Sequence, residues 1–336
     1  MTRHRPTTLA AVALAVACAF LPLPARPADP GQLLVLEQTI VLGHVSGRID
    51  HLAVDLHRRR LFVAELGNDS VDVIDLASGT RLHRIGGLKA PQGVAYVPAS
   101  DAIVVANADD GSVHFYRGGD FAELGVLNLE SDADNARVDP GTGQVVVGYG
   151  EGGLAVIDPT TRVEHQDIKL PGHPESFQID HRSRRAYVNV PNAGQIAVID
   201  FAAGRQVATW ALPGLAENFP MAIDDTGEIA SVFRSPPRLV LLDSRTGAVS
   251  GSYPTCADAD DVFFDPKRRR VYVSCGAGAV DVFSREATDA RHIDRIETAP
   301  GARTALFVPE LDRLYIARRA GPVGSDAAIL VFRPAP

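Results

Sequence analysis

Short apolar segments recur along the whole chain, and turns rich in glycine, asparagine and aspartate separate them. Segments such as LFVAE, IVVAN, AYVNV and VYVSC are rich in β-branched and aromatic residues, which is typical of β-strands. No long segment has the three-to-four-residue apolar spacing of an amphipathic helix. The pattern therefore predicts an all-β protein.

The strands repeat with a period of about 42 residues. The residues that end the first strand of each repeat are Asp55, Pro98, Asp139, Asp180, Asp224, Asp265 and Pro309. The residues that end the third strand give the same period, and they are Asp75, Tyr116, Asp158, Asp200, Asp243, Phe283 and Phe332. Such a period is typical of a β-propeller with four strands in each blade.

The repeats predict one seven-bladed β-propeller domain over residues 33–334. The seventh repeat ends after its third strand, AAILVFRP. We therefore expect LLVLEQTIVLG, residues 33–43, to supply its outer strand, because closing the ring removes exposed strand edges.

The segment VVVGYGEGGLAVID, residues 145–158, contains the G-x-G-x-x-G spacing of a dinucleotide-binding loop. In such a loop the last glycine opens a helix, whose N-terminus holds the phosphates. Here Gly153 precedes LAVID, a strand-like segment, and neighbouring repeats carry turn residues in the same place. We interpret Gly148, Gly150 and Gly153 as part of a β-hairpin in which glycine supplies positive φ angles.

The first 28 residues have the pattern of a cleaved secretory signal peptide. Basic residues at positions 3–5 precede an apolar stretch from Leu9 to Leu21, and prolines and small residues follow it. The stretch is short for a membrane span, so none is expected. A periplasmic or secreted protein is the prediction, and lipid attachment at Cys18 is an alternative.

Two further cysteines, Cys256 and Cys275, flank a predicted hairpin. In an oxidising compartment this arrangement favours a disulfide, with inert buried thiols as the alternative. No second pair of cysteines or histidines stands at zinc-finger spacing, so a zinc site is not expected.

The second strands LFVAE, IVVAN, AYVNV, VYVSC and LYIAR are each followed by a glycine-containing turn and often by V-x-V-I-D. Over nearly the whole mature chain this pattern resembles the YVTN-type repeat of the YncE-like seven-bladed propellers. The resemblance implies a propeller fold and a binding or scaffold role. The chain is also similar in outline to lactonase-type propellers, which keeps an enzymatic alternative open.

The residues that lead into the innermost strand of each blade are expected at one opening of the central channel. These residues are Asp50, Gly93, Asp134, Glu175, Phe219, Asp260 and Thr304. The residues that follow them are His51, Val94, Asn135, Ser176, Pro220, Asp261 and Ala305. Because side chains alternate along a strand, we expect only one of these two sets to face the channel.

Four residues of the first set are carboxylates, so we predict an acidic channel mouth. The ligand-binding candidates there are Asp50, His51, Asp134, Asn135, Glu175, Asn218, Asp260, Asp261 and Arg303. A formal net charge of −8 disfavours nucleic acid and anionic membrane surfaces as partners. We expect a monomer that binds a small cationic ligand or another exported protein, without catalysis.

The alternative function is a divalent-metal-dependent hydrolase or lactonase. Asp50, Asp134, Glu175 and Asp260 would then hold Ca²⁺ or Mg²⁺, which prefer oxygen ligands. A solvated acidic funnel without any ligand is the third interpretation of the same residues.

The opposite face is expected to carry a basic rim, because the turns DLHRRRL and DPKRRRV join first and second strands. Its arginines include Arg58, Arg59, Arg60, Arg268, Arg269 and Arg270. We interpret them as solvated residues that protect the sheet edges, with an anion-docking surface as the alternative. The isolated His173 and His181 are interpreted as surface-loop residues.

Overall fold

The computed structural model describes residue 1 and residues 31–286, 289–321 and 325–336. The predicted signal peptide, Cys18 included, therefore lies outside the described residues apart from Met1. The chain divides into a short unit, Met1–Gly31, and a compact unit, Gln32–Pro336. Everything below concerns the second unit.

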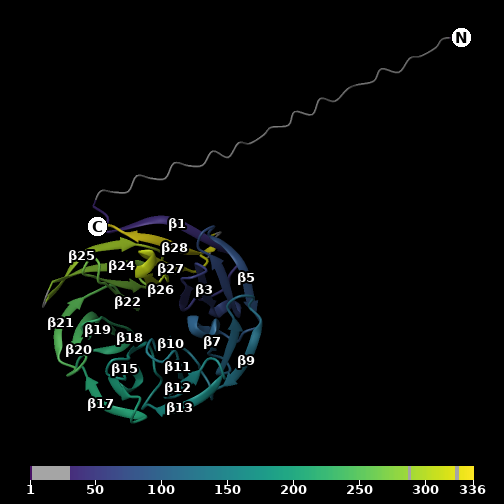
Figure 1. Cartoon of the computed structure of the whole chain (residues 1–336). Helices are drawn as coiled ribbons and strands as arrows, with labels where there is room; N and C mark the ends of the chain where they lie inside the picture. Colours follow the sequence, from purple (N-terminus) through teal and green to yellow (C-terminus); the bar gives the residue numbers. More distant parts are fainter. Residues whose placement is uncertain (2–30, 287–288, 322–324) are drawn as a thin grey trace. The chain divides into compact units, whose positions relative to one another are not determined.

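The unit Gln32–Pro336 is an all-β propeller in which seven four-stranded antiparallel sheets form a ring (Figure 1). The innermost strands are β2 (Leu52–Asp55), β6 (Pro91–Val97), β10 (Ala136–Val138), β14 (Phe177–Asp180), β18 (Ala216–Ile223), β22 (Ala259–Asp265) and β26 (Ala305–Val308). The second strands are β3 (Arg60–Glu65), β7 (Ala102–Asn107), β11 (Val145–Tyr149), β15 (Arg185–Val190), β19 (Glu228–Ser235), β23 (Arg270–Cys275) and β27 (Arg313–Arg318).

The remaining strands complete each blade toward the circumference. The third strands are β4 (Ser70–Asp75), β8 (Ser112–Arg117), β12 (Gly153–Asp158), β16 (Gln195–Asp200), β20 (Pro237–Asp243), β24 (Ala279–Glu286) and β28 (Ala327–Pro334). The outer strands are β5 (Thr80–Gly86), β9 (Glu123–Asn128), β13 (Val163–Lys169), β17 (Arg205–Ala211), β21 (Val249–Pro254), β25 (Asp289–Glu297) and β1 (Leu34–Gly43). Blades 1 to 6 are consecutive groups of four strands from β2 to β25, and blade 7 contains β26, β27, β28 and β1.

Burial explains why the sequence pattern differs between strands of one blade. Strands β3 and β4 are buried on both faces, because the neighbouring blades cover both sides of the sheet. The outer strand β13 instead alternates between exposed and partly buried residues. The core therefore lies between adjacent blades, and it is continuous around the ring.

Strand β1 closes the ring, as the sequence predicts. It pairs antiparallel with β28, and Ile40 lies opposite Ile329 in that register. Both side chains are buried in a core cluster that also includes residues of blade 1. Pairing the first strand with the last repeat gives the seventh sheet the same four strands as the others.

The glycine-rich segment is a hairpin and no helix follows it. Strands β11 and β12 pair antiparallel, with Tyr149 opposite Gly153. Gly150 has a φ of +58° and Gly152 a φ of +153°, so these two supply the positive φ angles of the turn. Gly148 and Gly153 lie inside the strands. The hairpin prediction is confirmed, although Gly152 rather than Gly148 or Gly153 shares the strained turn with Gly150.

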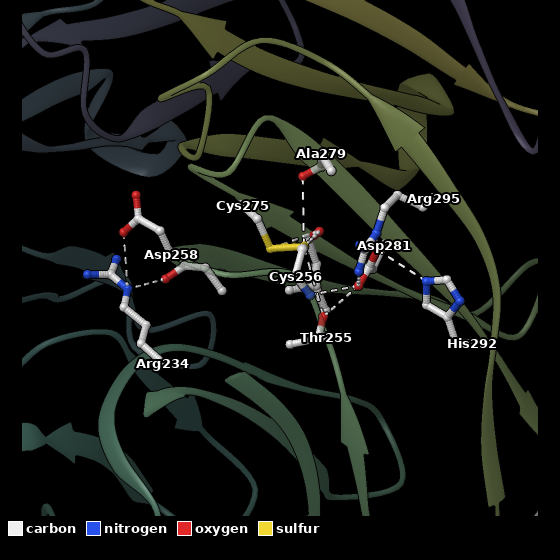
Figure 2. The surroundings of a disulfide bond; sticks show 11 residues. Arg234, Thr255, Cys256, Asp258, Cys275, Ala279, Asp281, His292 and Arg295 are labelled. Atoms are coloured by element: carbon white, nitrogen blue, oxygen red, sulfur yellow. Dashed lines mark hydrogen bonds and ion pairs between the residues drawn. A yellow bond between two sulfur atoms is a disulfide. The ribbon is translucent and has the colours of Figure 1, made fainter. Parts of the chain in front are cut away.

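The predicted disulfide is present. Cys256 and Cys275 are bonded, with their Cα atoms 5.9 Å apart, and both side chains are buried. Figure 2 shows the buried carboxylate of Asp281 beside this bond. The backbone N–H of Cys256 and the hydroxyl of Thr255 both donate to Asp281, at 2.8 and 3.0 Å.

No helix in the described part of the chain is long and apolar enough to cross a membrane.

Candidate functional site

A hollow of about 250 Å³ lies where the segments leading into the innermost strands meet, and we call it the channel mouth. Its lining residues are Arg48, Asp50, His51, Gln92, Asp132, Asp134, Asn135, His173, Glu175, Ser176, Phe219, Arg234, Asp260 and Arg303. They come from all seven blades or from the segments before them. The ring thus brings together side chains that are up to about 250 residues apart in the chain.

Most of the candidates from the sequence reach this hollow, and two lie elsewhere. Asn218 is buried between blades 4 and 5, where its side-chain N–H group donates to Asn189 Oδ1 and to Gln195 O. Asp261 lies deeper, on the channel wall formed by the innermost strands, and accepts a hydrogen bond from the backbone N–H of Ala305. Burial, together with the nearby charge of Asp260, raises the pKa of Asp261 well above its usual value.

The two sets of leading residues do not separate into channel-facing and outward-facing sets as expected. Asp50 and His51 both line the mouth, as do Asp134 and Asn135. Strand alternation does not apply to them, because β2 begins only at Leu52 and β10 only at Ala136. In blade 6, the pairing of β22 with β23 shifts between Ala259 and Asp261, which frees Asp260 from the regular register.

Arginines neutralise much of the predicted acidity. The guanidinium of Arg48 pairs with Asp50, and that of Arg234 pairs with Asp260. Arg303 lies 3.2 Å from Asp260 and donates to Asp258 at 2.8 Å. The mouth is therefore a mixed-charge site, in which Arg48 and Arg234 join the Arg303 that the sequence places among the acidic candidates.

Two histidines flank Asp134 in the mouth. His51 Nε2 lies 3.8 Å from Asp134 Oδ1, and His173 Nε2 lies 3.7 Å from Asp134 Oδ2. Burial lowers the pKa of His51 to about 4, and the nearby positive charge of Arg137 adds to this effect. Burial also disfavours the charged form of His173, but contacts with Asp134, the Gly150 carbonyl and Asp132 raise its pKa to about 9.

His173 is thus a mouth residue and not the surface-loop residue that the sequence analysis expects. Its side chain is only 15% exposed, and its Nδ1 atom contacts the carbonyl oxygen of Gly150 at 2.7 Å. The turn between β11 and β12 holds this carbonyl, so the glycine-rich hairpin has a role in positioning the histidine.

Glu175 stands apart from the other acids of the mouth. Asp50, Asp132, Asp134 and Asp260 each lie within ion-pair distance of an arginine or a histidine. Glu175 makes no such pair with any residue that the structure describes. Burial, and then the negative charges of Asp134 and Asp260, raise its pKa to about 7.

The wall beside Glu175 combines an aromatic ring with a cation. The guanidinium carbon of Arg234 lies 3.9 Å from the centroid of the Phe219 ring. This stacking and the ion pair with Asp260 fix the direction of Arg234, which leaves the end of β19 and reaches across to blade 6. Opposite this wall, the side-chain oxygen of Asn135 is buried and has no hydrogen-bond partner among the described residues.

The described residues contain no group of three or more histidine, cysteine, aspartate or glutamate side chains that is placed to hold a metal ion. In the mouth Asp50 and Asp260 pair with arginines, and His51 Nε2 lies 3.8 Å from both Asp50 and Asp134. This arrangement suits recognition of charged groups by ion pairs and hydrogen bonds.

The expected basic rim is only partly a row of free charges. Arg58 and Arg268 bridge adjacent blades by ion pairs with Asp101 and Asp312. Arg60 and Arg270 donate to backbone carbonyls, those of Gly118 and Ala335. Arg59 and Arg269 occupy positive-φ turn positions, with φ angles of 53° and 51°. The arginines of these turns therefore hold blades and turns together.

Sequence reasoning missed Arg48 and Arg234 as well as His173. Arg48 stands two residues before Asp50, in SGRID, whereas Arg303, which the sequence did point to, stands at the position of Asp50 in the seventh repeat. No sequence signal pointed to Arg234, because it ends a second strand and reaches the mouth only through the length of its side chain.

Comparison with known proteins supports the fold and goes no further. The chain matches no family model and no curated protein sequence. Among solved structures it is similar to a chain of Kuenenia stuttgartiensis hydrazine synthase, with a TM-score of 0.72 and 16% identity over 85% of this chain and 95% of that chain. It is also similar to a chain of a mitotic checkpoint complex, with a TM-score of 0.77 and 12% identity over 96% of this chain and 99% of that one. At such identities the likeness concerns the propeller fold alone, and the YVTN-type resemblance stays an interpretation of the motifs.

Proposed function

We propose that this chain is an exported binding protein that holds a small organic cation, such as a primary or quaternary ammonium, at the channel mouth. The observation that carries this proposal is Glu175, a partly buried carboxylate without an ion-pair partner among the described residues. The disulfide between Cys256 and Cys275 is compatible with the oxidising compartment that export implies.

The charges of the mouth support a cationic ligand. Its lining includes five carboxylates, which face the guanidiniums of Arg48, Arg234 and Arg303 and the protonated imidazole of His173. The ionised site therefore has one negative charge without a partner, and Glu175 is the residue left over. A buried unpaired charge is unfavourable, so a bound ammonium would relieve that cost.

The volume of the channel mouth limits the size of the ligand that it can hold. A hollow of about 250 Å³ is smaller than the pockets that enclose drug-sized molecules, which begin at about 300 Å³. Small diamines and amino-acid-sized ammonium compounds fit this limit.

The raised pKa of Glu175 predicts how binding depends on pH. The carboxylate is protonated below its pKa of about 7 and ionised above it. Only the ionised form attracts an ammonium, so affinity should rise between about pH 6 and pH 8.

Isothermal titration with putrescine, choline and lysine as probes tests the proposal. We expect saturable binding of at least one probe at pH 8, and binding at least tenfold weaker in Glu175→Gln. The matched control is Glu310→Gln, because Glu310 is exposed and lies outside the mouth, and it should bind like the unmodified protein. Equal affinity in Glu175→Gln, or no binding of any probe, would refute the proposal.

A thermal melt separates the organic cation from a metal ion. With EDTA, and then with added Ca²⁺ or Mg²⁺, we expect an unchanged melting temperature, because Asp50 and Asp260 pair with arginines. A rise in melting temperature with Ca²⁺ or Mg²⁺ that disappears in Glu175→Gln would replace the proposal by the metal-site alternative.

A further inference from the structure

A second cavity, of about 510 Å³, lies at the boundary between blades 3 and 4. It is lined by side chains of both blades and is separate from the channel mouth, with which it shares no residue. Its apolar part includes Val146, Ile179 and Phe201, and its polar part includes His181 and Arg184. The sequence analysis assigned no role to these residues other than a surface position for His181.

Two other blade boundaries carry an arginine bridge at the equivalent position. Between blades 1 and 2, Arg58 Nη1 donates to Asp55 at 2.9 Å and to Asp101 at 2.7 Å. The hydroxyl of Tyr96 also donates to Asp101, at 2.8 Å. This boundary also has a cavity, of about 470 Å³, but the charges that line it are paired with one another.

The boundary between blades 6 and 7 carries the same arginine bridge. Arg268 Nη1 donates to Asp265 at 3.0 Å and to Asp312 at 2.7 Å. Asp312 and Asp101 occupy equivalent places, since each stands at a positive φ directly before a second strand. The arginine bridge is thus a repeated feature of the propeller, and not a peculiarity of one blade pair.

At the boundary between blades 3 and 4 the same positions hold different residues. Asp139 keeps the place of Asp55, but Thr142 stands where blade 1 has Arg58. Arg184, with a φ of 56°, stands where blade 2 has Asp101. Ile179 replaces the tyrosine, as the strand registers show. The boundary between blades 3 and 4 therefore lacks the arginine bridge, and its cavity carries the cation Arg184 in the place of an aspartate.

The replaced residues also leave a positive charge without a partner. Arg184 is exposed and forms no ion pair with any described residue. The carboxylate of Asp139 is engaged by its own turn, where it accepts from the Gly141 N–H and the Thr142 hydroxyl, each at 2.8 Å. Asp200, whose pKa responds to the charge of Arg184, accepts backbone N–H groups of its own turn as well.

We propose that this cavity binds an amphipathic carboxylate, a molecule with one anionic group and a short hydrocarbon body. The carboxylate would pair with Arg184 in the way that Asp101 pairs with Arg58 at the boundary between blades 1 and 2. The hydrocarbon part would cover Val146, Ile179 and Phe201, which line the cavity. A volume of about 510 Å³ is within the range of small-molecule sites, about 300–1,000 Å³.

Titration with decanoate below its micelle concentration, followed by calorimetry, tests this site. We expect saturable binding that becomes about tenfold weaker in Arg184→Gln, which removes the charge and keeps much of the side chain. The matched control is Arg182→Gln, because Arg182 belongs to the same turn but donates to the Asp225 carbonyl in blade 5. Absence of decanoate binding, or equal binding in Arg184→Gln, would overturn the proposal.

A second variant rebuilds the arginine bridge, so that a paired carboxylate replaces the unpaired cation at position 184. Thr142→Arg combined with Arg184→Asp rebuilds the bridge found at the other two boundaries, and aspartate is well suited to the positive φ of position 184. We expect this double variant to lose decanoate binding while its melting temperature stays equal or rises. Retained binding would refute the proposal even if Arg184→Gln failed to fold. Glu175→Gln should leave decanoate binding unchanged. The proposal for the cavity can therefore be refuted without refuting the proposal for the channel mouth, and the reverse also holds.

Discussion

The imidazole of His173 lies 3.7 Å from the carboxylate of Asp134 at the channel mouth. On the other side of the same carboxylate stands His51, at 3.8 Å. Both histidines lie beside the same carboxylate, but their surroundings differ. Burial and the positive charge of Arg137 lower the pKa of His51, whereas the Gly150 carbonyl and Asp132 help to raise the pKa of His173. One of them is therefore neutral and the other charged at neutral pH.

This difference predicts two separate histidine titrations. In an NMR titration of the imidazole groups we expect a midpoint of about 9 for His173 and about 4 for His51. Asp134→Asn should lower the midpoint of His173, because it removes the negative charge that favours the protonated form. Equal midpoints for His51 and His173 would contradict the described geometry.

The raised pKa values of His173 and Glu175 also make the stability of the folded protein depend on pH in a defined direction. The pKa of His173 is raised in the folded protein, so its stabilising contribution is complete below about pH 6.5 and is lost as the pH rises through about 9. The pKa of Glu175 is raised as well, and a raised carboxyl pKa makes the folded state less stable as the pH rises from about 4 to about 7.

Removing the disulfide should destabilise the propeller without changing its fold. The bond joins residues separated by 19 positions, and closing a loop of this length contributes about 3 kcal/mol in the chain-entropy model. Urea denaturation of the Cys256→Ala and Cys275→Ala double variant should show a lower free energy of unfolding by this amount. A reducing agent should have no further effect on the double variant. An unchanged unfolding free energy would show that the bond does not constrain the unfolded chain.

The closure of the ring by β1 can be tested by substituting two adjacent residues of this strand. Ile40 is 2% exposed and packs in the core, whereas its neighbour Val41 is 57% exposed. Ile40→Ala should cost about 2–5 kcal/mol of unfolding free energy, because it leaves a cavity between β1 and blade 1. Val41→Ala should change the same quantity by no more than about 0.5 kcal/mol. Similar effects of both substitutions would mean that β1 does not seal the ring.

The sequence was informative wherever a feature depends on the repeat. Aligned strand ends such as Asp55, Asp139 and Asp265 predict the seven sheets, and they place Asp50 and Asp134 at one opening of the ring. The proximity of Cys256 and Cys275 was predictable for the same reason, since they flank the hairpin of β22 and β23. A regular repeat fixes the backbone path, and with it the side of the ring on which each loop lies.

The balance of charge at the mouth was not predictable in this way. Arg234 reaches Asp260 from a different blade, and Asp50 and His51 lie before the strand whose alternation would set their direction. The hydrogen bond from Asn218 to Asn189, which removes Asn218 from the mouth, likewise depends on how two blades pack.

The repeat in the amino-acid sequence by itself determined the fold and the ring closure, because these follow from local strand patterns that recur along the chain. Only the tertiary structure decided between a disulfide and two free thiols at Cys256 and Cys275, which carboxylate at the mouth has no partner, and that Arg184 lines a cavity without an ion-pair partner among the described residues. The last two outcomes depend on the directions of long side chains across blade boundaries, and residue spacing does not specify those directions.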